Sequence, residues 1–140
     1  MSACLTESFV ANPSKKPNMV LFDEGFQIPK FLEHHKTANE LTYQLFSAPN
    51  VNDRVWAAEQ MGKKGAKNIY LKPLFYSLEN DKFWGVRKEC ASAIAKLSFN
   101  NKDKKIISIY EREIDGRVKS EIIRTLKKSK DKSTILFLIN

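Results

Sequence analysis

Residues 81–97, DKFWGVRKECASAIAKL, carry the clearest helical pattern in the chain. The residues Val86, Cys90, Ala91, Ile94 and Leu97 lie three or four positions apart, which places them on one stripe of an α-helix. Several of these residues are small, and small side chains allow another helix to approach closely. An aromatic pair, a glycine and an arginine stand at the start of the helix. The stretch is therefore typical either of a joint between packed helices or of a ligand site.

The same pattern occurs three times, which indicates an internal repeat. The segment DRVWAAEQM aligns without a gap at a spacing of 33, so that Arg54 meets Arg87. The segment GRVKSEIIRTL aligns at a spacing of 32, so that Arg87 meets Lys119. A second helical pattern precedes each copy and keeps the same offsets at Leu41, Leu74 and Ile106. Each unit is therefore predicted to contain two helices.

Two antiparallel helices of this length cannot bury their apolar faces alone, so neighbouring pairs must stack. The sequence predicts an all-α fold, an α-α superhelix of HEAT-like helical repeats, with a short β-segment at the N-terminus. Turns between helices are expected at Gly62, Gly65 and Gly116. The expected repeats cover residues 37–140, as units of about 37–66, 67–100 and 101–130 and the start of a fourth unit at 131–140.

Residues 1–36 do not follow the repeat. The run NMVLF has the composition of a strand, DEG is a turn signal, and FQIPKFL is a candidate second strand that Pro29 would keep at a sheet edge. An isolated hairpin is only marginally stable in water. We expect this segment to pack on the first helices or to be the remnant of a preceding sheet.

The C-terminal segment STILFLIN begins a fourth unit, because Leu138 lies 32 residues after Ile106. The last repeat of a complete stack normally has a polar outer face, whereas ILFLI is apolar. We expect the chain to be a piece of a longer protein, or its last helix to fold back or to self-associate with another copy.

Charge and composition narrow the function classes. Residues 41–140 hold twenty basic residues against eleven acidic ones, a net charge of +9, which favours an acidic partner. No apolar run approaches the roughly 18 residues needed to span a membrane, and the N-terminus lacks the pattern of a secretion signal, so no compartment is assigned.

Two cysteines make no disulfide framework, and Cys90 is expected to be a small buried residue.

Five residues are expected at the joints between repeats: Phe83, Trp84, Gly85, Arg54 and Arg87. The aromatic pair would wedge between units or, alternatively, form an exposed platform for a base or peptide. Gly85 would free the backbone before a helix that begins at Val86. The arginines would bond carboxylates or carbonyls of a neighbouring turn, with Asp53, Asp81 and Asp115 as candidates, or else ligate a phosphate.

No catalytic, cofactor-binding or metal-binding residue is assigned. The only histidines, His34 and His35, are adjacent, so they diverge on a helix or a strand and cannot readily chelate one metal. The sequence contains no HExxH motif and no glycine-rich phosphate loop. We expect this chain alone to be no enzyme.

Lysines recur with the repeat and would align along one edge of the stack. Such a basic ridge suits a phosphate backbone or an acidic protein surface. The alternative is that lysines in these turns serve solubility alone. The candidate ridge consists of Lys63, Lys64, Lys67, Lys102, Lys104, Lys105, Lys127, Lys128, Lys130 and Lys132.

The segments MVLFDEG, ELTYQL, DRVWAAEQMG and FWGVRKECASAIAKL, in this order, resemble the C-terminal part of aminopeptidase N-like zinc metallopeptidases. The resemblance implies that residues 8–126 correspond to the end of a small β-sandwich followed by a HEAT-like helical domain. In that family the zinc and its ligands lie in a separate catalytic domain, so no catalytic residue is carried over to this chain.

The resemblance implies a non-catalytic C-terminal domain that packs against the catalytic and β-sandwich domains of its parent and controls access of peptides. The alternative function is a stand-alone HEAT-repeat binding module for nucleic acid or an acidic protein partner. The first requires no zinc in this chain, and the second predicts binding that weakens steeply with salt.

Overall fold

A computed structural model describes residues 36–65, 68–98 and 101–140. The chain divides into two compact units, Met1–Lys36 and Thr37–Asn140. The expected N-terminal β-segment falls in the first unit and lies outside the described residues, as do His34, His35 and Lys67. The unit Thr37–Asn140 contains all of the described helices.

The described part of the chain is all-α, as the sequence predicts. It holds seven α-helices, one short 3-10 helix and no strand. None of the described helices is long and apolar enough to cross a membrane. The elements are α2 (Ala38–Ser47), α3 (Val51–Lys63), η2 (Asn68–Tyr70), α4 (Leu71–Asn80), α5 (Trp84–Lys96), α6 (Lys102–Arg112), α7 (Gly116–Leu126) and α8 (Lys132–Ile139).

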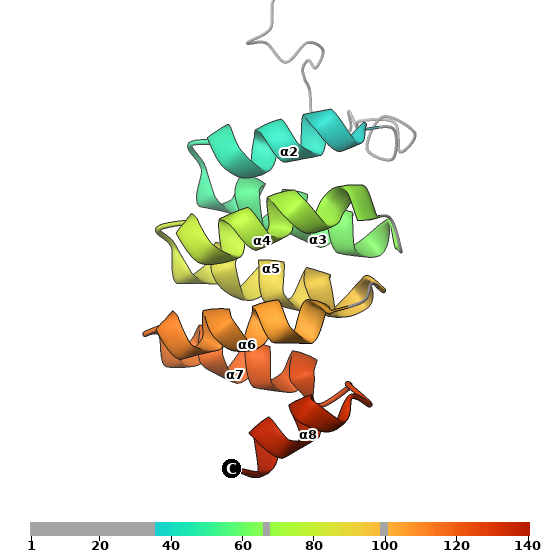
Figure 1. Cartoon of the computed structure of the whole chain (residues 1–140). Coiled ribbons are helices and arrows are strands. Elements are labelled where there is room, and N and C mark those ends of the chain that lie inside the picture. Colours follow the sequence, from blue (N-terminus) through green and yellow to red (C-terminus); the bar gives the residue numbers. More distant parts are fainter. Residues whose placement is uncertain (1–35, 66–67, 99–100) are drawn as a thin grey trace, which may run out of the picture. The chain divides into compact units, whose positions relative to one another are not determined.

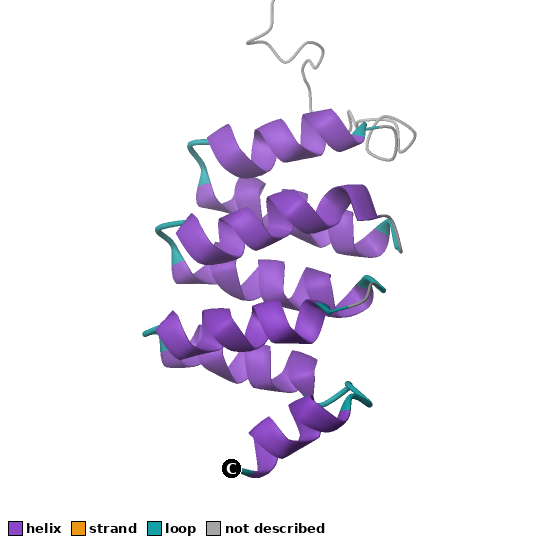
Figure 2. Cartoon of the chain, viewed as in Figure 1, coloured by secondary structure: helices purple, strands orange, loops and turns teal. Residues whose placement is uncertain are grey.

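The helices pack in successive pairs. Helices α2, α4 and α6 pack against α3, α5 and α7, respectively, and α5 also packs between α3 and α7. In Figure 1, α2, α4 and α6 form the front layer of this unit and α3, α5 and α7 lie behind them. The turns within pairs lie at the left edge, and the turns between pairs at the right edge (Figure 2). Turns of one kind are therefore brought together along one edge.

Side-chain caps start several of these helices. The side chains of Thr37, Asn50, Asp115 and Asp131 accept hydrogen bonds from backbone N–H groups in the first turns of α2, α3, α7 and α8. Such caps satisfy donors that have no partner inside the helix. Each of these residues directly precedes its helix, so short polar side chains fix the points at which the chain enters four of the helices.

The apolar stripes of the repeat form one core. Leu41, Leu74 and Ile106, the equivalent residues of the three first helices, are all at most 1% exposed. Small residues line α3 and α5, where Ala57 and Cys90 are fully buried, whereas the equivalent position of α7 holds the larger Ile122. Burial raises the pKa of the Cys90 thiol well above its usual value. The prediction that Cys90 is a buried residue is confirmed.

Two of the glycines expected in turns, Gly62 and Gly116, lie in helices instead. Gly62 lies inside α3 rather than in a turn, and a Cβ there would stand 3.0 Å from both Cα and Cβ of Ala93. It therefore allows α3 and α5 to approach closely. Gly65 adopts a φ of 79° just after α3, which suits a turn. Gly116 is the first residue of α7 rather than part of a turn, because Asp115 caps the helix immediately before it.

Candidate functional site

Arg54, in the first turn of α3, joins the first helix pair to the second. Its Nε lies 2.8 Å from Oδ2 of Asp81 and its Nη2 lies 3.1 Å from Oδ1. Its Nη1 donates to the carbonyl oxygen of Ala48 at 2.8 Å. The side chains of Arg54 and Asp81 are 16% and 9% exposed. Arg54 therefore links the C-cap residue of α2 to the C-cap residue of α4.

Arg87 makes the same set of bonds one pair further along. Its Nε and Nη2 lie 2.8 and 3.0 Å from the two carboxylate oxygens of Glu113, and its Nη1 donates to the carbonyl oxygen of Asp81 at 2.8 Å. The side chains of Arg87 and Glu113 are 15% and 5% exposed. Burial raises the pKa of Glu113, but hydrogen bonds from Arg87 and from two backbone N–H groups outweigh it, so the pKa is lowered overall.

The two joints are equivalent in sequence as well as in geometry. Ala48, Asp81 and Glu113 are the C-cap residues that directly follow α2, α4 and α6, and they lie 33 and 32 positions apart. Arg54 follows Ala48 by six residues, and Arg87 follows Asp81 by six residues, and each arginine bonds the carbonyl oxygen of that residue. A fork of two parallel N–H groups matches a carboxylate, so one arginine can fix the relative position of two helix ends.

Lys119 occupies the third position of this series but makes a different contact. Its Nζ lies 4.7 Å from the centre of the Tyr110 ring. Within the described residues it has no carboxylate at salt-bridge distance. The series of arginine joints therefore ends at α7.

Of the three aspartates that the sequence suggests as partners of the joint arginines, Asp81 is the one whose carboxylate pairs with Arg54, and none pairs with Arg87. Asp81 pairs with Arg54, whereas Asp115 pairs with Arg117 two residues away at 2.7 Å. The interpretation of the sequence missed Glu113, the partner of Arg87. The signal was present, because Glu113 lies 32 residues after Asp81, the same spacing as between Arg87 and Lys119.

The two residues of the aromatic pair differ in burial, because Trp84 packs against the core whereas Phe83 is partly exposed. Trp84 packs at the edge of the core, and the guanidinium carbon of Arg117 lies 3.8 Å from the centre of its ring. Phe83 is 37% exposed and its ring centre lies 5.4 Å from that of Trp84. A Cβ on Gly85 would stand 2.5 Å from the Phe83 ring. Because α5 begins at Trp84, Gly85 lies inside the helix and makes room for that ring, rather than freeing the backbone ahead of Val86.

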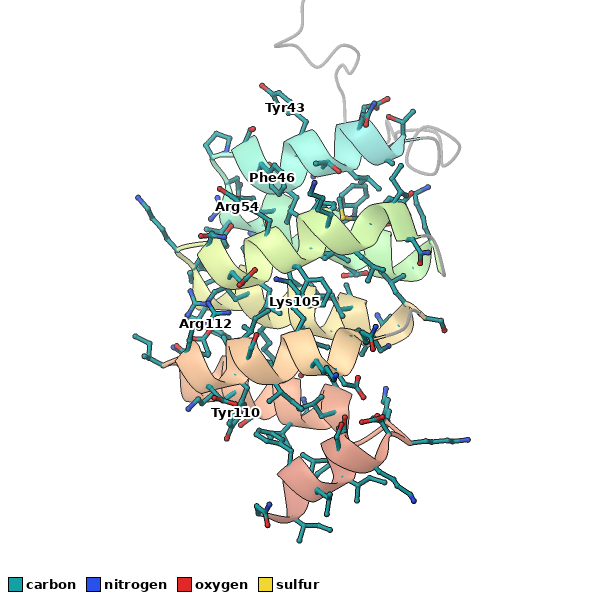
Figure 3. All side chains as sticks on the ribbon, in the orientation of Figure 1. Tyr43, Phe46, Arg54, Lys105, Tyr110 and Arg112 are labelled. Atoms are coloured by element: carbon teal, nitrogen blue, oxygen red, sulfur yellow. The ribbon has the colours of Figure 1, made fainter. Side chains whose placement is uncertain are left out.

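Glu79 on α4 connects the second pair to the third at the surface. Lys105 and Arg112 of α6 bind its two oxygens at 3.2 and 3.0 Å (Figure 3). Burial raises the pKa of Glu79, but the hydrogen bonds from these two cations outweigh it and lower the pKa overall. This link supplements the buried joint of Arg87 on the same two helix pairs.

The ten candidate lysines do not form one uniform ridge. Lys63 pairs with Glu59 and Lys105 with Glu79. Lys102 donates from Nζ to the carbonyl oxygen of Leu97 at 2.6 Å, and burial lowers its pKa. Lys64 also has an interaction partner. The remaining described members are exposed and have no salt bridge to a described residue: Lys104, Lys127, Lys128, Lys130 and Lys132.

A shallow pocket of about 370 Å³ lies between the α5–α6 and α7–α8 turns. Lys102, Lys104 and Lys128 contribute to its wall, together with Asp103 and Asp131. Asp103 accepts a hydrogen bond from the hydroxyl of Ser129 and another from Thr134 at 3.0 Å. The pocket is therefore of mixed charge, and hydrogen bonds within the chain occupy its carboxylates.

Exposed aromatic side chains lie on the front layer. Tyr43 on α2 is 73% exposed and projects away from the neighbouring helices (Figure 3). The Phe46 and Tyr76 rings lie 5.2 Å apart and connect the surfaces of α2 and α4. Tyr43 and Tyr76 are 33 residues apart, so they occupy equivalent positions that the sequence interpretation did not single out.

No group of three or more histidine, cysteine, aspartate and glutamate side chains in the described ranges is arranged to hold a metal ion. Compared with known proteins, the chain matches no family model, no curated protein and no solved structure. The interpretation of this chain therefore depends on its own residues and their geometry.

Proposed function

We propose that residues 37–140 form a HEAT-like α-α superhelix that acts as a non-catalytic interaction scaffold. One observation carries the proposal: Arg54–Asp81 and Arg87–Glu113 repeat the same bidentate joint at equivalent positions of successive helix pairs. A joint that recurs at equivalent positions constrains each helix pair relative to the next in the same way. Stacks of this kind present extended surfaces to their partners.

The parent of this scaffold is proposed to be an aminopeptidase N-like protein. The order of the sequence segments supports this origin, and the zinc would reside in the separate catalytic domain. In such a parent, residues 37–140 would pack against the catalytic and β-sandwich domains and restrict the peptides that enter.

An immunoblot of source lysate with an antibody raised to this chain tests the parent. A native band several-fold heavier than 16.1 kDa, carrying zinc and aminopeptidase activity after immunoprecipitation, is the expected result. A native band near 16.1 kDa leaves no room for a catalytic domain and overturns this origin. Tightly bound stoichiometric zinc in the isolated chain would contradict the non-catalytic role.

A second candidate function is binding of nucleic acid or an acidic protein along the edge where the turns between pairs meet. The observation in its favour is the group of five exposed lysines at the α5–α6 and α7–α8 turns, which we call the basic edge: Lys104, Lys127, Lys128, Lys130 and Lys132. Positive charge gathered on one edge releases counterions when it meets a phosphate backbone.

Binding of generic duplex DNA at increasing salt tests this second function. The triple substitution Lys127→Ala, Lys128→Ala and Lys130→Ala should weaken binding and reduce the salt slope by about three. The matched control removes three exposed lysines from elsewhere, Lys72→Ala, Lys82→Ala and Lys88→Ala. Equal effects of the two triple variants, or no binding at low salt, would rule out a specific basic edge.

A further inference from the structure

Two exposed aromatic side chains bridge α2 and α4 on the front layer, and we call them the ring pair: Phe46 and Tyr76. They are 47% and 58% exposed, and their ring centres lie 5.2 Å apart with the ring planes tilted by 56°. The Tyr76 hydroxyl makes no hydrogen bond to a described residue. The ring pair therefore offers apolar ring surface and a free hydroxyl donor at one place.

Surplus positive charge lies one helix further along the front layer, in what we call the cationic cluster: Glu79, Lys105 and Arg112. Both cations bind the one carboxylate, which leaves one positive charge in excess. The side chains of Lys105 and Arg112 are 47% and 61% exposed, whereas that of Glu79 is 22% exposed. The cluster therefore presents positive charge to solvent. Figure 3 shows Phe46, Lys105 and Arg112 on helices of the front layer.

The ring pair and the cationic cluster stand one step of the helix series apart. Phe46 and Glu79 are 33 positions apart in the sequence. The ring pair joins α2 to α4 and the cluster joins α4 to α6, and packed helices lie about 8–10 Å apart. An extended chain in the polyproline II conformation advances about 9 Å in three residues. Such a chain, crossing the front layer, would place side chains three positions apart on the ring pair and on the cluster.

The chemistry of the two places favours such a chain. Polyproline II segments dock on exposed aromatic rings, and their backbone carbonyl oxygens have no internal partners, so a tyrosine hydroxyl can donate to them. The cationic cluster attracts a carboxylate. The net charge of +9 on residues 41–140 favours a partner of the same acidic kind.

We propose that the front layer binds an extended segment of a partner protein that carries a proline and, three residues away, an aspartate or glutamate. The proline packs on Phe46 and Tyr76, and the carboxylate meets Lys105 and Arg112. This inference rests on the proposed scaffold function and names the chemistry of its partner.

A short labelled peptide tests the ring pair. It has two central prolines, each separated by two alanines from a terminal glutamate, so that either chain direction offers the required spacing. The full chain is titrated into it by fluorescence anisotropy. We expect saturable binding that Tyr76→Ala weakens about tenfold or more. Phe83→Ala is the control, because it removes a partly exposed ring that precedes α5 and should leave the affinity unchanged.

Changes to the peptide test the spacing without any change to the chain. Alanines in place of both prolines should weaken binding about tenfold, because the peptide loses both its extended conformation and its apolar rings. Moving each glutamate next to its proline should also weaken binding, because the carboxylate no longer reaches the cationic cluster. Equal affinity for all three peptides overturns the proposal.

Charge reversal tests the cationic cluster. Arg112→Glu should weaken binding of the glutamate peptide about tenfold. A peptide with lysines in place of both glutamates should bind this variant more tightly than it binds the wild-type chain. Lys88→Glu is the charge-matched control, because Lys88 is an exposed cation of α5. Circular dichroism confirms that the variants keep their helices. Binding that Tyr76→Ala leaves unchanged, or charge reversal that the lysine peptide does not follow, overturns the proposal.

Other occupants of this surface are outcomes of the same measurements. Binding of a labelled oligothymidylate that Tyr76→Ala abolishes, without peptide binding, assigns the rings to nucleic acid and overturns the proposal. Self-association that Phe46→Asp abolishes, without peptide binding, assigns them to a second copy of the chain and also overturns it. Absence of peptide binding with an intact energetic coupling between Arg87 and Glu113 overturns this inference alone. Loss of that coupling overturns the scaffold function on which it rests.

Discussion

Arg87 and Glu113 are joined by two parallel hydrogen bonds, with Nε 2.8 Å from Oε2 and Nη2 3.0 Å from Oε1. The pair links the second helix of one helix pair to the end of the first helix of the next. The same arginine also binds the carbonyl oxygen of Asp81. One side chain therefore holds the ends of α4 and α6 together at the edge where the turns within pairs lie.

This joint should contribute strongly to stability. We expect Arg87→Met to lower the free energy of unfolding by about 3 kcal/mol, because it leaves the nearly buried Glu113 carboxylate without its cation. The double variant Arg87→Met/Glu113→Gln should recover part of this loss, since no buried charge remains. Urea unfolding measures each variant. The exposed pair Glu59 and Lys63 is the control, with an expected coupling below about 1 kcal/mol.

Gly62 should be intolerant of a side chain. Its missing Cβ leaves 3.0 Å to the backbone Cα of Ala93, so Gly62→Ala would push α3 and α5 apart. We expect a loss of about 1–3 kcal/mol in the free energy of unfolding. Gly116→Ala is the matched control, because nothing lies within 4 Å of its Cβ position, and it should be neutral or stabilise by up to about 1 kcal/mol. Equal effects at the two glycines would refute the close approach.

Protonation of Glu113 and Glu79 at low pH should lower the free energy of unfolding. Hydrogen bonds from Arg87, and from Arg112 and Lys105, hold the pKa values of these carboxyls below their usual value despite burial. Because the folded pKa is lower than the unfolded one, their contribution is complete above the unfolded value of about 4.3. It is lost as the pH falls through the folded pKa.

Thermal unfolding between pH 7 and pH 2.5 checks this dependence. Glu113→Gln should flatten the loss of stability on the acid side relative to the wild-type chain. The matched control is Glu111→Gln, which removes an exposed glutamate of α6 that forms no salt bridge with a described residue. An acid profile of Glu113→Gln that is identical to wild type would contradict the assigned role.

Glu89 should show the opposite pH dependence. Burial raises the pKa of its carboxyl, so the charged form is disfavoured in the folded state. Its contribution to stability is present below the unfolded pKa and is lost as the pH rises through the folded pKa. We therefore expect Glu89→Gln to raise the melting temperature at pH 7 more than at pH 4. A larger gain at pH 4 would show that another charge controls this site.

Much of the helical arrangement could be predicted because it depends on local periodicity. Apolar residues at three and four residue steps form helix stripes wherever they occur, and the 33 and 32 residue spacings placed Arg54 and Arg87 at one position. The partners of these arginines were harder to predict. Asp53, Asp81 and Asp115 each lie within six residues of one of the aligned basic residues Arg54, Arg87 and Lys119. The carboxylates that bind Arg54 and Arg87 instead lie 27 and 26 residues away, and the packing of successive pairs brings them within reach.

The partners of the lysines also could not be predicted from the sequence. Their spacing predicts that they gather near the turns between pairs, where Lys104, Lys127, Lys128, Lys130 and Lys132 are exposed. The sequence could not reveal that Lys105 binds Glu79 across two helices or that Lys102 caps the end of α5. Gly62 has the sequence signature of a turn, yet it lies within α3, where its missing side chain leaves space for Ala93 of α5.

The sequence by itself determined the helices and the positions that correspond between successive helix pairs, because helical periodicity and spacing depend only on the order of residues along the chain. The tertiary structure alone decided which carboxylate binds each arginine, which lysines remain exposed and where α2 and α4 leave aromatic side chains exposed. Those outcomes depend on distances between helices about 26 to 33 residues apart in sequence. Only packing sets such distances, since hydrogen bonds and ion pairs form within about 3 to 4 Å.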